Sequence, residues 1–192
     1  MAGDPVSAMP QKIGSRERVR NYLEARGLAD GLFEFEQSTK TAQQAADAMA
    51  CELGQIVKSL VFVVDGQPVV ALVAGDRRGD PEAIASLLGG KKARFADADT
   101  VRSATGYAIG GVSPFDLPAD LPVLADLSLE RFAVVYPAAG TPTSMVRLQR
   151  GVLFELSGAR AERISQPFRE EAPAPGPTRS VVGAPHDAGP LS

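Results

Sequence analysis

The chain has 192 residues, 44% of them hydrophobic, which is room for one ordinary domain with a real core. Its 20 basic and 23 acidic residues give a net charge of −3, which argues against a protein that binds nucleic acid over its whole surface. The chain has one cysteine (Cys51) and one histidine (His186). A single cysteine excludes a disulfide framework, and so few cysteines and histidines argue against cysteine–histidine catalysis and against metal sites built from these residues. We therefore expect chemistry based on lysine, carboxylates, hydroxyls or the backbone, with no metal and no cofactor.

Three segments differ in composition. Residues 1–12 are expected to form a flexible N-terminal arm, and residues 13–165 the folded domain. Residues 166–192 contain six prolines and a single aromatic residue, too little apolar surface to offset the entropy of ordering, and are expected to be a disordered tail that includes His186. No run of about 18 apolar residues and no signal-peptide pattern occurs, which predicts a soluble cytoplasmic protein.

Hydrophobic periodicity and turn signals predict helices and strands in mixed order. In chain order they are a helix over 15–26 capped by Ser15, a strand over 31–37, a helix over 41–50 opened by a Thr41–Gln44 capping box, a hairpin of strands over 56–64 and 69–74, a helix from Asp80 to 88, a strand over 91–95, a helix over 97–105, strands over 122–126, 132–136 and 143–148, and a helix over 149–157. Several strands follow one another by hairpins, so we expect an α+β fold with a mixed or antiparallel curved sheet.

Lys58 is the most informative single residue, because it interrupts an apolar strand. Alternation along 56–64 places it on one face with Leu60 and Phe62, and places Ser59 on the other face. An ammonium on an apolar face is costly without a partner. Lys58 therefore either snorkels to solvent at the strand edge or points into a pocket, where it could hold an anionic group or act as a base.

Two loops could complete a site with Lys58. The segment 106–114 contains Gly110, Gly111 and Pro114, and its bare amides could cradle an oxyanion, although an ordinary turn would also explain it. The small-residue segment 138–144 reads as a hairpin loop that could also form a pocket wall. If the site is catalytic, the Lys58 amine and the amides of 110–114 should converge on one cleft.

Two basic clusters could contact phosphate groups weakly or could simply be solvated. One occupies the first helix and its approach: Lys12, Arg16, Arg18, Arg20 and Arg26. The other contains Arg77, Arg78, Lys91, Lys92 and Arg94. With a nearly balanced charge, binding through either cluster should depend strongly on salt.

Five segments in this order resemble a known family: QIVKSLVF (55–62), LVAGDRR (72–78), ATGYAIGGVSPF (104–115), LPVLAD (121–126) and AAGTP (138–142). The chain is similar over about residues 38–164 to the YbaK/prolyl-tRNA synthetase-associated editing domain family. The resemblance implies a barrel-like mixed sheet with surrounding helices, and hydrolysis of the ester that joins a wrong amino acid to the 3′ end of tRNA.

The resemblance also implies roles for particular residues. Lys58 matches the essential lysine of the family, and Gly110 and Pro114 match its Gly-x-x-x-Pro loop. The catalytic candidates are Lys58 and Gly110, and the substrate-binding candidates are Ser38, Ser59, Gly111, Val112, Ser113, Pro114, Thr143 and Ser144. The implied partners are the acceptor end of aminoacyl-tRNA and prolyl-tRNA synthetase, with no membrane.

Two departures leave the removed amino acid open. Thr143 stands where synthetase inserts often carry histidine, and 138–140 replaces the Ser-Gly-Gly-like turn of cysteine-specific members. We expect a small substrate such as Ala, Ser, Thr or Cys, most readily from tRNA(Pro). A non-catalytic module that binds tRNA ends or nucleotides is the main alternative, and an interaction protein that acts through its tail is another.

Overall fold

The computed structural model describes residues 13–36 and 41–168. Within them lie five α-helices: α1 (Ser15–Glu24), α2 (Ala42–Met49), α3 (Pro81–Leu87), α4 (Ala98–Thr105) and α5 (Arg150–Ser157). The same residues form eleven strands: β1 (Leu32–Glu34), β2 (Ile56–Val64), β3 (Gln67–Ala74), β4 (Arg77–Gly79), β5 (Ala93–Phe95), β6 (Val123–Asp126), β7 (Val134–Pro137), β8 (Ser144–Val146), β9 (Leu148–Gln149), β10 (Arg160–Glu162) and β11 (Ser165–Pro167). None of the helices in these ranges has the length and hydrophobicity that a membrane span needs.

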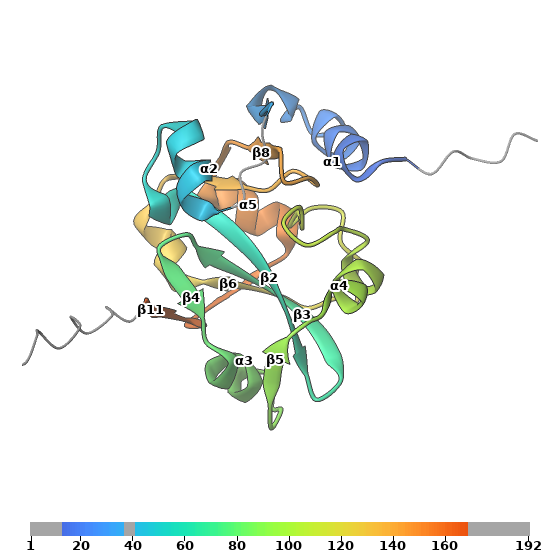
Figure 1. The fold of residues 1–192 in the computed structure, drawn as a ribbon, viewed down its shortest axis with the longest axis vertical. Coiled ribbons are helices and arrows are strands. Elements are labelled where there is room, and N and C mark those ends of the chain that lie inside the picture. The colour runs from blue at the N-terminus through green and yellow to red at the C-terminus, as the bar shows by residue number, and fades with distance from the viewer. Residues whose placement is uncertain (1–12, 37–40, 169–192) are drawn as a thin grey trace, which may run out of the picture.

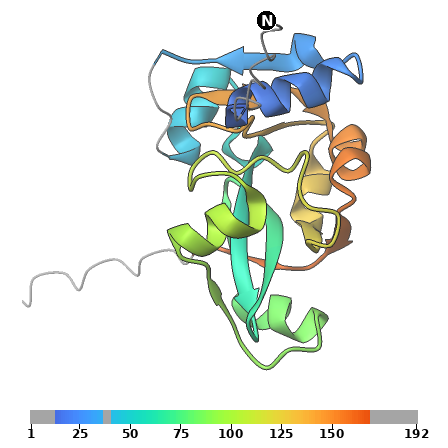
Figure 2. The same cartoon turned by 90° about the vertical axis from the view of Figure 1, so that its right-hand side faces the viewer.

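A curled seven-stranded sheet forms the centre of the molecule, in the order β10-β6-β3-β2-β7-β9 with β5 also paired to β2. The pairs β2–β3, β2–β5 and β7–β9 are antiparallel, whereas β3–β6, β2–β7 and β6–β10 are parallel. The expected α+β fold with a mixed, curved sheet is therefore confirmed. The β2–β3 hairpin runs along the molecule, with α1, β1 and β8 at one end and α3 and β5 at the other (Figure 1, Figure 2).

The turn of this hairpin explains why the two strands pair along their whole length. Asp65 (φ 46°) and Gly66 (φ 94°) both adopt left-handed backbone conformations, as a two-residue turn between twisted strands requires. The Asp65 carboxylate also accepts the backbone N–H groups of Lys91 (2.7 Å) and Lys92 (3.2 Å). The turn thereby fixes the approach to β5, which pairs with the same strand.

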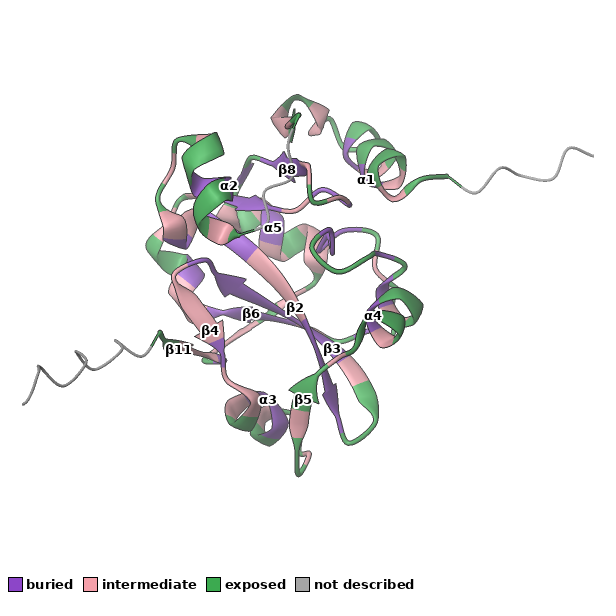
Figure 3. Ribbon diagram, in the orientation of Figure 1, coloured by how far each residue is buried: buried purple, intermediate pink, exposed green. Residues whose placement is uncertain are grey.

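Two apolar layers cover the two faces of the sheet. On one face, Val57 and Val61 of β2 pack against apolar residues of α1, α4 and α5. On the other face, Phe62 packs with Ile84 of α3. β3 is buried from Val69 onward, because it lies inside the sheet and is covered on both faces (Figure 3). The middle of β2 is only half-buried, and this is where the site lies.

Several element boundaries differ from the sequence-based prediction. Gly14, not Ser15, occupies the N-cap position of α1. The predicted strand over 143–148 is divided into β8, which pairs with β1, and β9, which pairs with β7. β11 pairs with β4, so the folded part continues past the expected boundary at residue 165. The capping box of Thr41 and Gln44 at the start of α2 is confirmed.

Candidate active site

The site begins at a gap along one edge of β2. On that edge β7 pairs with Ile56 and Val57, and β5 pairs with Phe62–Val64. The Ala96 N–H also donates to the Val61 carbonyl at 2.9 Å. Among the described strands none pairs with residues 58–60 on this side. Main-chain groups of β2 are therefore accessible from a cavity that opens at the gap.

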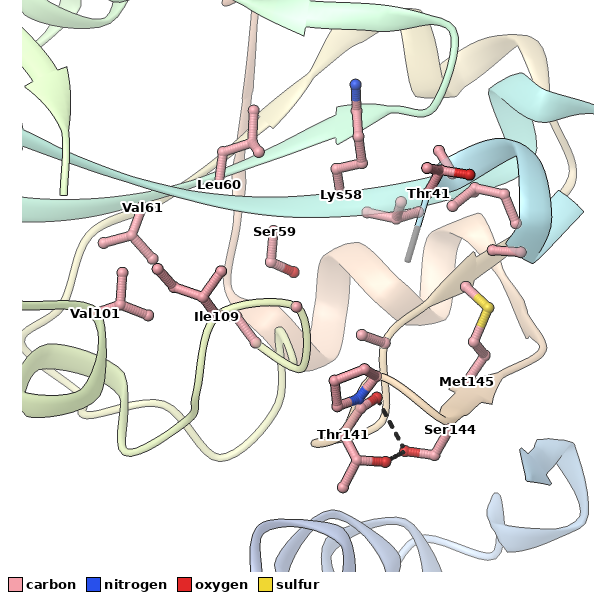
Figure 4. Close-up of a pocket in the computed structure, with 18 of the residues that line it drawn as sticks. Thr41, Lys58, Ser59, Leu60, Val61, Val101, Ile109, Thr141, Ser144 and Met145 are labelled. Atoms are coloured by element: carbon pink, nitrogen blue, oxygen red, sulfur yellow. Dashed lines mark hydrogen bonds between the residues drawn. The ribbon is translucent and has the colours of Figure 1, made fainter. Parts of the chain in front are cut away.

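The cavity has a volume of about 370 Å³ and is lined mainly by apolar side chains. Its walls are the exposed edge of β2, the N-terminal turn of α2, the loop before Val112 and the segment from Ala138 to Met145 (Figure 4). The remaining lining residues come from the end of β5 and from α4. Both loops singled out in the sequence thus meet at one cavity.

Ser59 points into this cavity (Figure 4). Its Oγ is buried, and no hydrogen-bonding group of the described residues lies within reach of it. A buried hydroxyl without a partner costs about 1–3 kcal/mol. A polar group of a molecule in the cavity could remove that cost by accepting from or donating to Ser59.

A chain of hydroxyl groups forms part of the opposite wall. Ser144 Oγ donates its single proton to the Ala139 carbonyl (3.0 Å), so Thr141 is the donor in its 2.7 Å contact with Ser144. Thr143 then donates to Thr141 Oγ1 at 3.2 Å. Since these protons are committed within the wall, the hydroxyls of the two lining residues, Thr141 and Ser144, are left as acceptors, which suits an ammonium or hydroxyl group.

The glycine-rich loop packs directly on this wall. Gly110 has a left-handed backbone (φ 86°), and a Cβ atom added to Gly111 would lie 2.7 Å from Thr141 Cα. The Gly111 N–H donates to the Ala108 carbonyl (3.0 Å), so this amide is not bare as the sequence suggested. The close contact requires glycine at 111 and holds Gly110 and Val112 against the cavity.

Lys58 leaves β2 on the other face of the sheet from Ser59 (Figure 4). Its Nζ donates to the Arg77 carbonyl and lies 5.0 Å from the centroid of the Phe168 ring. Burial lowers the pKa of the Lys58 amine below its usual value, and the negative charge of Asp76 opposes this shift. Asp76 is itself held by Arg131 through two hydrogen bonds of 2.7 and 2.8 Å.

The structure thus brings Lys58 and Gly110 to one cavity, as expected, but turns the Lys58 ammonium away from the glycine-rich loop. Lys58 does line the cavity, but its ammonium is turned toward Arg77 because even-numbered residues of β2 face the α3 side of the sheet. With its ammonium in this position, the lysine can hold a group that lies outside the cavity.

The other predicted residues divide into two groups. Those that line the cavity are Ser59, Gly110, Val112 and Ser144. Gly111, Ser113, Pro114 and Thr143 are not among its lining residues, and Ser38 lies outside the described residues. Ser113 is fully buried, and Pro114 lines a separate groove together with Tyr22. Thr143 is connected to the cavity wall only through its hydrogen bond to Thr141.

The lining residues that the sequence analysis did not connect with the site include Thr41, Phe95 and Met145. Thr41 was identified only as a helix cap, whereas Ile109 and Thr141 lie within the two loops that were expected to form the site. Phe95 was placed at the end of a predicted strand, but only the pairing of β5 with β2 shows that it flanks the gap.

Comparison with known proteins supplies the family. The sequence profile of the aminoacyl-tRNA editing domain matches residues 36–156, which contain the whole β2 gap and both loops. The chain belongs to this family. The resemblance stated from the five sequence segments is thereby confirmed.

Three relatives illustrate how far the similarity extends. The uncharacterised protein YwhH of Bacillus subtilis is 38% identical over 144 residues, which are 74% of this chain and 91% of YwhH. A proline–tRNA ligase of Citrifermentans bemidjiense is 36% identical over 122 residues, which are 62% of this chain and only 21% of the ligase. A crystal structure described as a candidate trans-editing enzyme for prolyl-tRNA synthetase has a TM-score of 0.73 and 38% identity, and the match covers 81% of this chain and 99% of that one.

Proposed function

We propose that this editing-domain protein is a free-standing aminoacyl-tRNA deacylase, which hydrolyses the ester of tRNA(Pro) carrying a small wrong amino acid. The observation that carries the proposal is the cavity at the β2 gap, where Ser59 Oγ is buried without a partner opposite a wall of acceptor hydroxyls. Family membership and the similar candidate trans-editing enzyme support it.

The size of the cavity supports an aminoacyl group as the occupant. Ligand pockets commonly measure about 300–1,000 Å³, and this cavity is near the lower limit. A small amino acid and its ester group fit such a volume, whereas the nucleotide that carries them would remain at the mouth. The acceptor oxygens of the wall suit the ammonium group of the amino acid, and Ser59 suits a carbonyl or hydroxyl oxygen.

An aminoacyl ester is already reactive, so the protein need not supply a strong nucleophile. Holding the ester and a water or ribose hydroxyl in reacting geometry accounts for much of a rate enhancement, and one well-placed donor to the developing oxyanion contributes about 3 kcal/mol. Ser59 and main-chain groups of the β2 gap are the donors available beside the ester. Lys58 would hold a phosphate or ribose of the terminal nucleotide from the outer face.

Small amino acids are the substrates for which editing is most needed. One methylene group changes binding by only about 1–3 kcal/mol, so a synthetase cannot reject Ala, Ser, Thr or Cys by binding alone. We infer that the protein acts on tRNA released by or shared with prolyl-tRNA synthetase in the cytoplasm, in line with the match to part of a proline–tRNA ligase.

The test is a deacylation assay on tRNA(Pro) charged in turn with Ala, Ser, Thr, Cys and Pro. We expect release of at least one small amino acid by the wild-type protein, retention of proline, and loss of release in Lys58→Ala. Arg26→Ala, which removes a cation from the end of α1, serves as the control and should keep full activity. If all four mischarged tRNAs survive the wild-type protein, the deacylase proposal is wrong.

The outward position of the Lys58 ammonium favours a second candidate, a module that binds tRNA ends without hydrolysis. It predicts saturable, salt-dependent binding of uncharged and mischarged tRNA(Pro) with equal affinity and no release of amino acid. The same assay, combined with a binding measurement, separates the two candidates.

A further inference from the structure

Phe95 is an exposed aromatic residue at the mouth of the cavity. It is the last residue of β5, directly beside the β2 gap, and 58% of its surface is accessible. Its ring lies 4.4 Å from the ring of Phe62, which fixes it on the sheet. Ile109, 59% exposed, also lines the cavity, from the glycine-rich loop. Exposed apolar side chains gathered at a cavity mark a contact site.

Phe95 also lines a second groove of about 900 Å³, and it is the residue that the cavity and this groove share. The charged residues along this groove are Arg78, Lys91, Lys92, Asp80 and Glu82. Three cations and two carboxylates leave a net charge of +1, and the Asp80 carboxylate is engaged at the N-terminus of α3, where it accepts from Glu82 N (3.0 Å) and Ala83 N (3.2 Å).

The two basic clusters of the sequence differ in their partners. On α1, Arg16 and Arg20 both pair with Glu34, and Arg18 pairs with Asp116. Within residues 13–36 and 41–168, no carboxylate forms an ion pair with Arg77, Arg78, Lys91, Lys92 or Arg94. Arg78 donates to Gln166 Oε1 (2.9 Å) and Arg77 to Ser165, both uncharged partners, so the positive charge of the cluster around β4 and β5 is not neutralised by an ion pair.

We propose that the groove is the path of the unpaired 3′ strand of an RNA, with a base stacked on Phe95 and phosphates along Arg78, Lys91 and Lys92. The inference rests on the proposed function, which supplies an RNA end whose terminal ester enters the cavity. Base stacking on an aromatic ring tolerates any sequence, and phosphate contacts with lysine and arginine add a salt-dependent attraction. Lys58, on the same face of β2 as Phe62, would meet the backbone between the cavity and the groove.

The binding test uses a fluorescein-labelled, uncharged RNA hexanucleotide that ends in CCA. Phe95→Leu keeps an apolar contact with Phe62 but removes the aromatic face, and we expect its Kd to rise about tenfold. Phe33→Leu, at a 40% exposed phenylalanine on β1, is the matched control and should bind like the wild type. Lys91→Gln/Lys92→Gln should lower the slope of log Kd against log salt by about 1.4, whereas Arg16→Gln/Arg20→Gln should leave the slope unchanged.

Deacylation kinetics with mischarged tRNA(Pro) separate this inference from the proposed function. We expect Phe95→Leu to raise KM about as much as it raises Kd and to leave kcat within twofold, with circular dichroism spectra like those of the wild type. If the wild type hydrolyses mischarged tRNA and both groove variants match their controls in Kd, salt slope and KM, the RNA path is wrong. If RNA binding depends on Phe95 but nothing is hydrolysed, the path stands and the deacylase proposal fails.

Discussion

Lys58 and Ser59 are neighbours on β2, yet their side chains lie on opposite faces of the sheet. The lysine ammonium donates to the Arg77 carbonyl, and the serine hydroxyl is buried beside the cavity with no partner among the described groups. Both residues border the same gap in the strand pairing. A ligand at this gap could therefore touch the hydroxyl from inside the cavity and the amine from outside it.

Ser59→Ala should reduce activity without reducing stability. The variant removes a hydroxyl that has no partner to lose in the free protein, and it removes one hydrogen bond to the proposed substrate. We expect kcat/KM to fall about 2- to 12-fold, the value of one hydrogen bond of about 0.5–1.5 kcal/mol, with an unchanged or higher Tm. Ser157→Ala is the crossed control: its hydroxyl donates to the Leu153 carbonyl (2.7 Å) away from the cavity, so it should lower Tm and leave kcat/KM alone.

The fall of deacylation activity at alkaline pH, the alkaline limb of the pH profile, should follow the deprotonation of the Lys58 ammonium. Burial lowers its pKa below 10.5, so activity that needs the charged form is lost as the pH rises through that lowered value. The charge of Asp76 opposes the shift, and Asp76→Asn should therefore move the limb to still lower pH. The measurement is initial deacylation rate against pH, corrected for spontaneous ester hydrolysis. Asp116→Asn, which disrupts an ion pair with Arg18, should leave the limb in place.

Gly111→Ala should separate the two loops that form the cavity wall. Its Cβ would lie 2.7 Å from Thr141 Cα and 2.9 Å from the Gly140 carbonyl oxygen, both backbone atoms that cannot rotate away. We expect a loss of about 1–3 kcal/mol of stability together with a marked fall in kcat/KM. Gly151→Ala, where a Cβ meets nothing within 4 Å in the first turn of α5, should be neutral or stabilising by urea denaturation. Equal stabilities of the two variants would contradict the close packing of the loops.

Tyr107 should make stability depend on pH above 10. Its hydroxyl donates to the Phe115 carbonyl (2.8 Å) across the glycine-rich loop, and burial raises its pKa to about 12. Between pH 10 and 12 the unfolded chain releases this proton while the folded chain keeps it, so stability falls as the pH rises. Tyr107→Phe should be less stable than wild type at pH 9 by about 1–3 kcal/mol. The difference should shrink by about 1.4 kcal/mol at pH 11.

Local patterns predicted those elements whose stabilising contacts lie close in sequence. The β2–β3 hairpin has its turn, its apolar alternation and its partner strand within 56–74, and the capping box of α2 lies within four residues. By contrast, β4, β10 and β11 were missed. Each has three residues and pairs with a strand distant in the chain, so backbone hydrogen bonds stabilise it without any hydrophobic pattern.

The same distinction applies to the site. Alternation correctly separated Lys58 from Ser59, but the face that holds the cavity is decided by where β5 and β7 end on the neighbouring edge. No local pattern contains that information. The sequence analysis ranked Ser59 below Lys58 for this reason, although the Ser59 side chain points into the cavity and the Lys58 ammonium points away from it.

The gap in β2 also bears on self-association. An unpaired strand edge is a template on which a second polypeptide can add a strand, and long open edges promote aggregation. Here the open stretch covers only residues 58–60 and is closed at both ends by β5 and β7. Strands in proteins commonly have about five or six residues, so a pairing limited to three residues would contribute little to the association of two chains. The molecule can therefore expose main-chain groups at the gap while offering a second copy of the chain only a short edge for strand pairing.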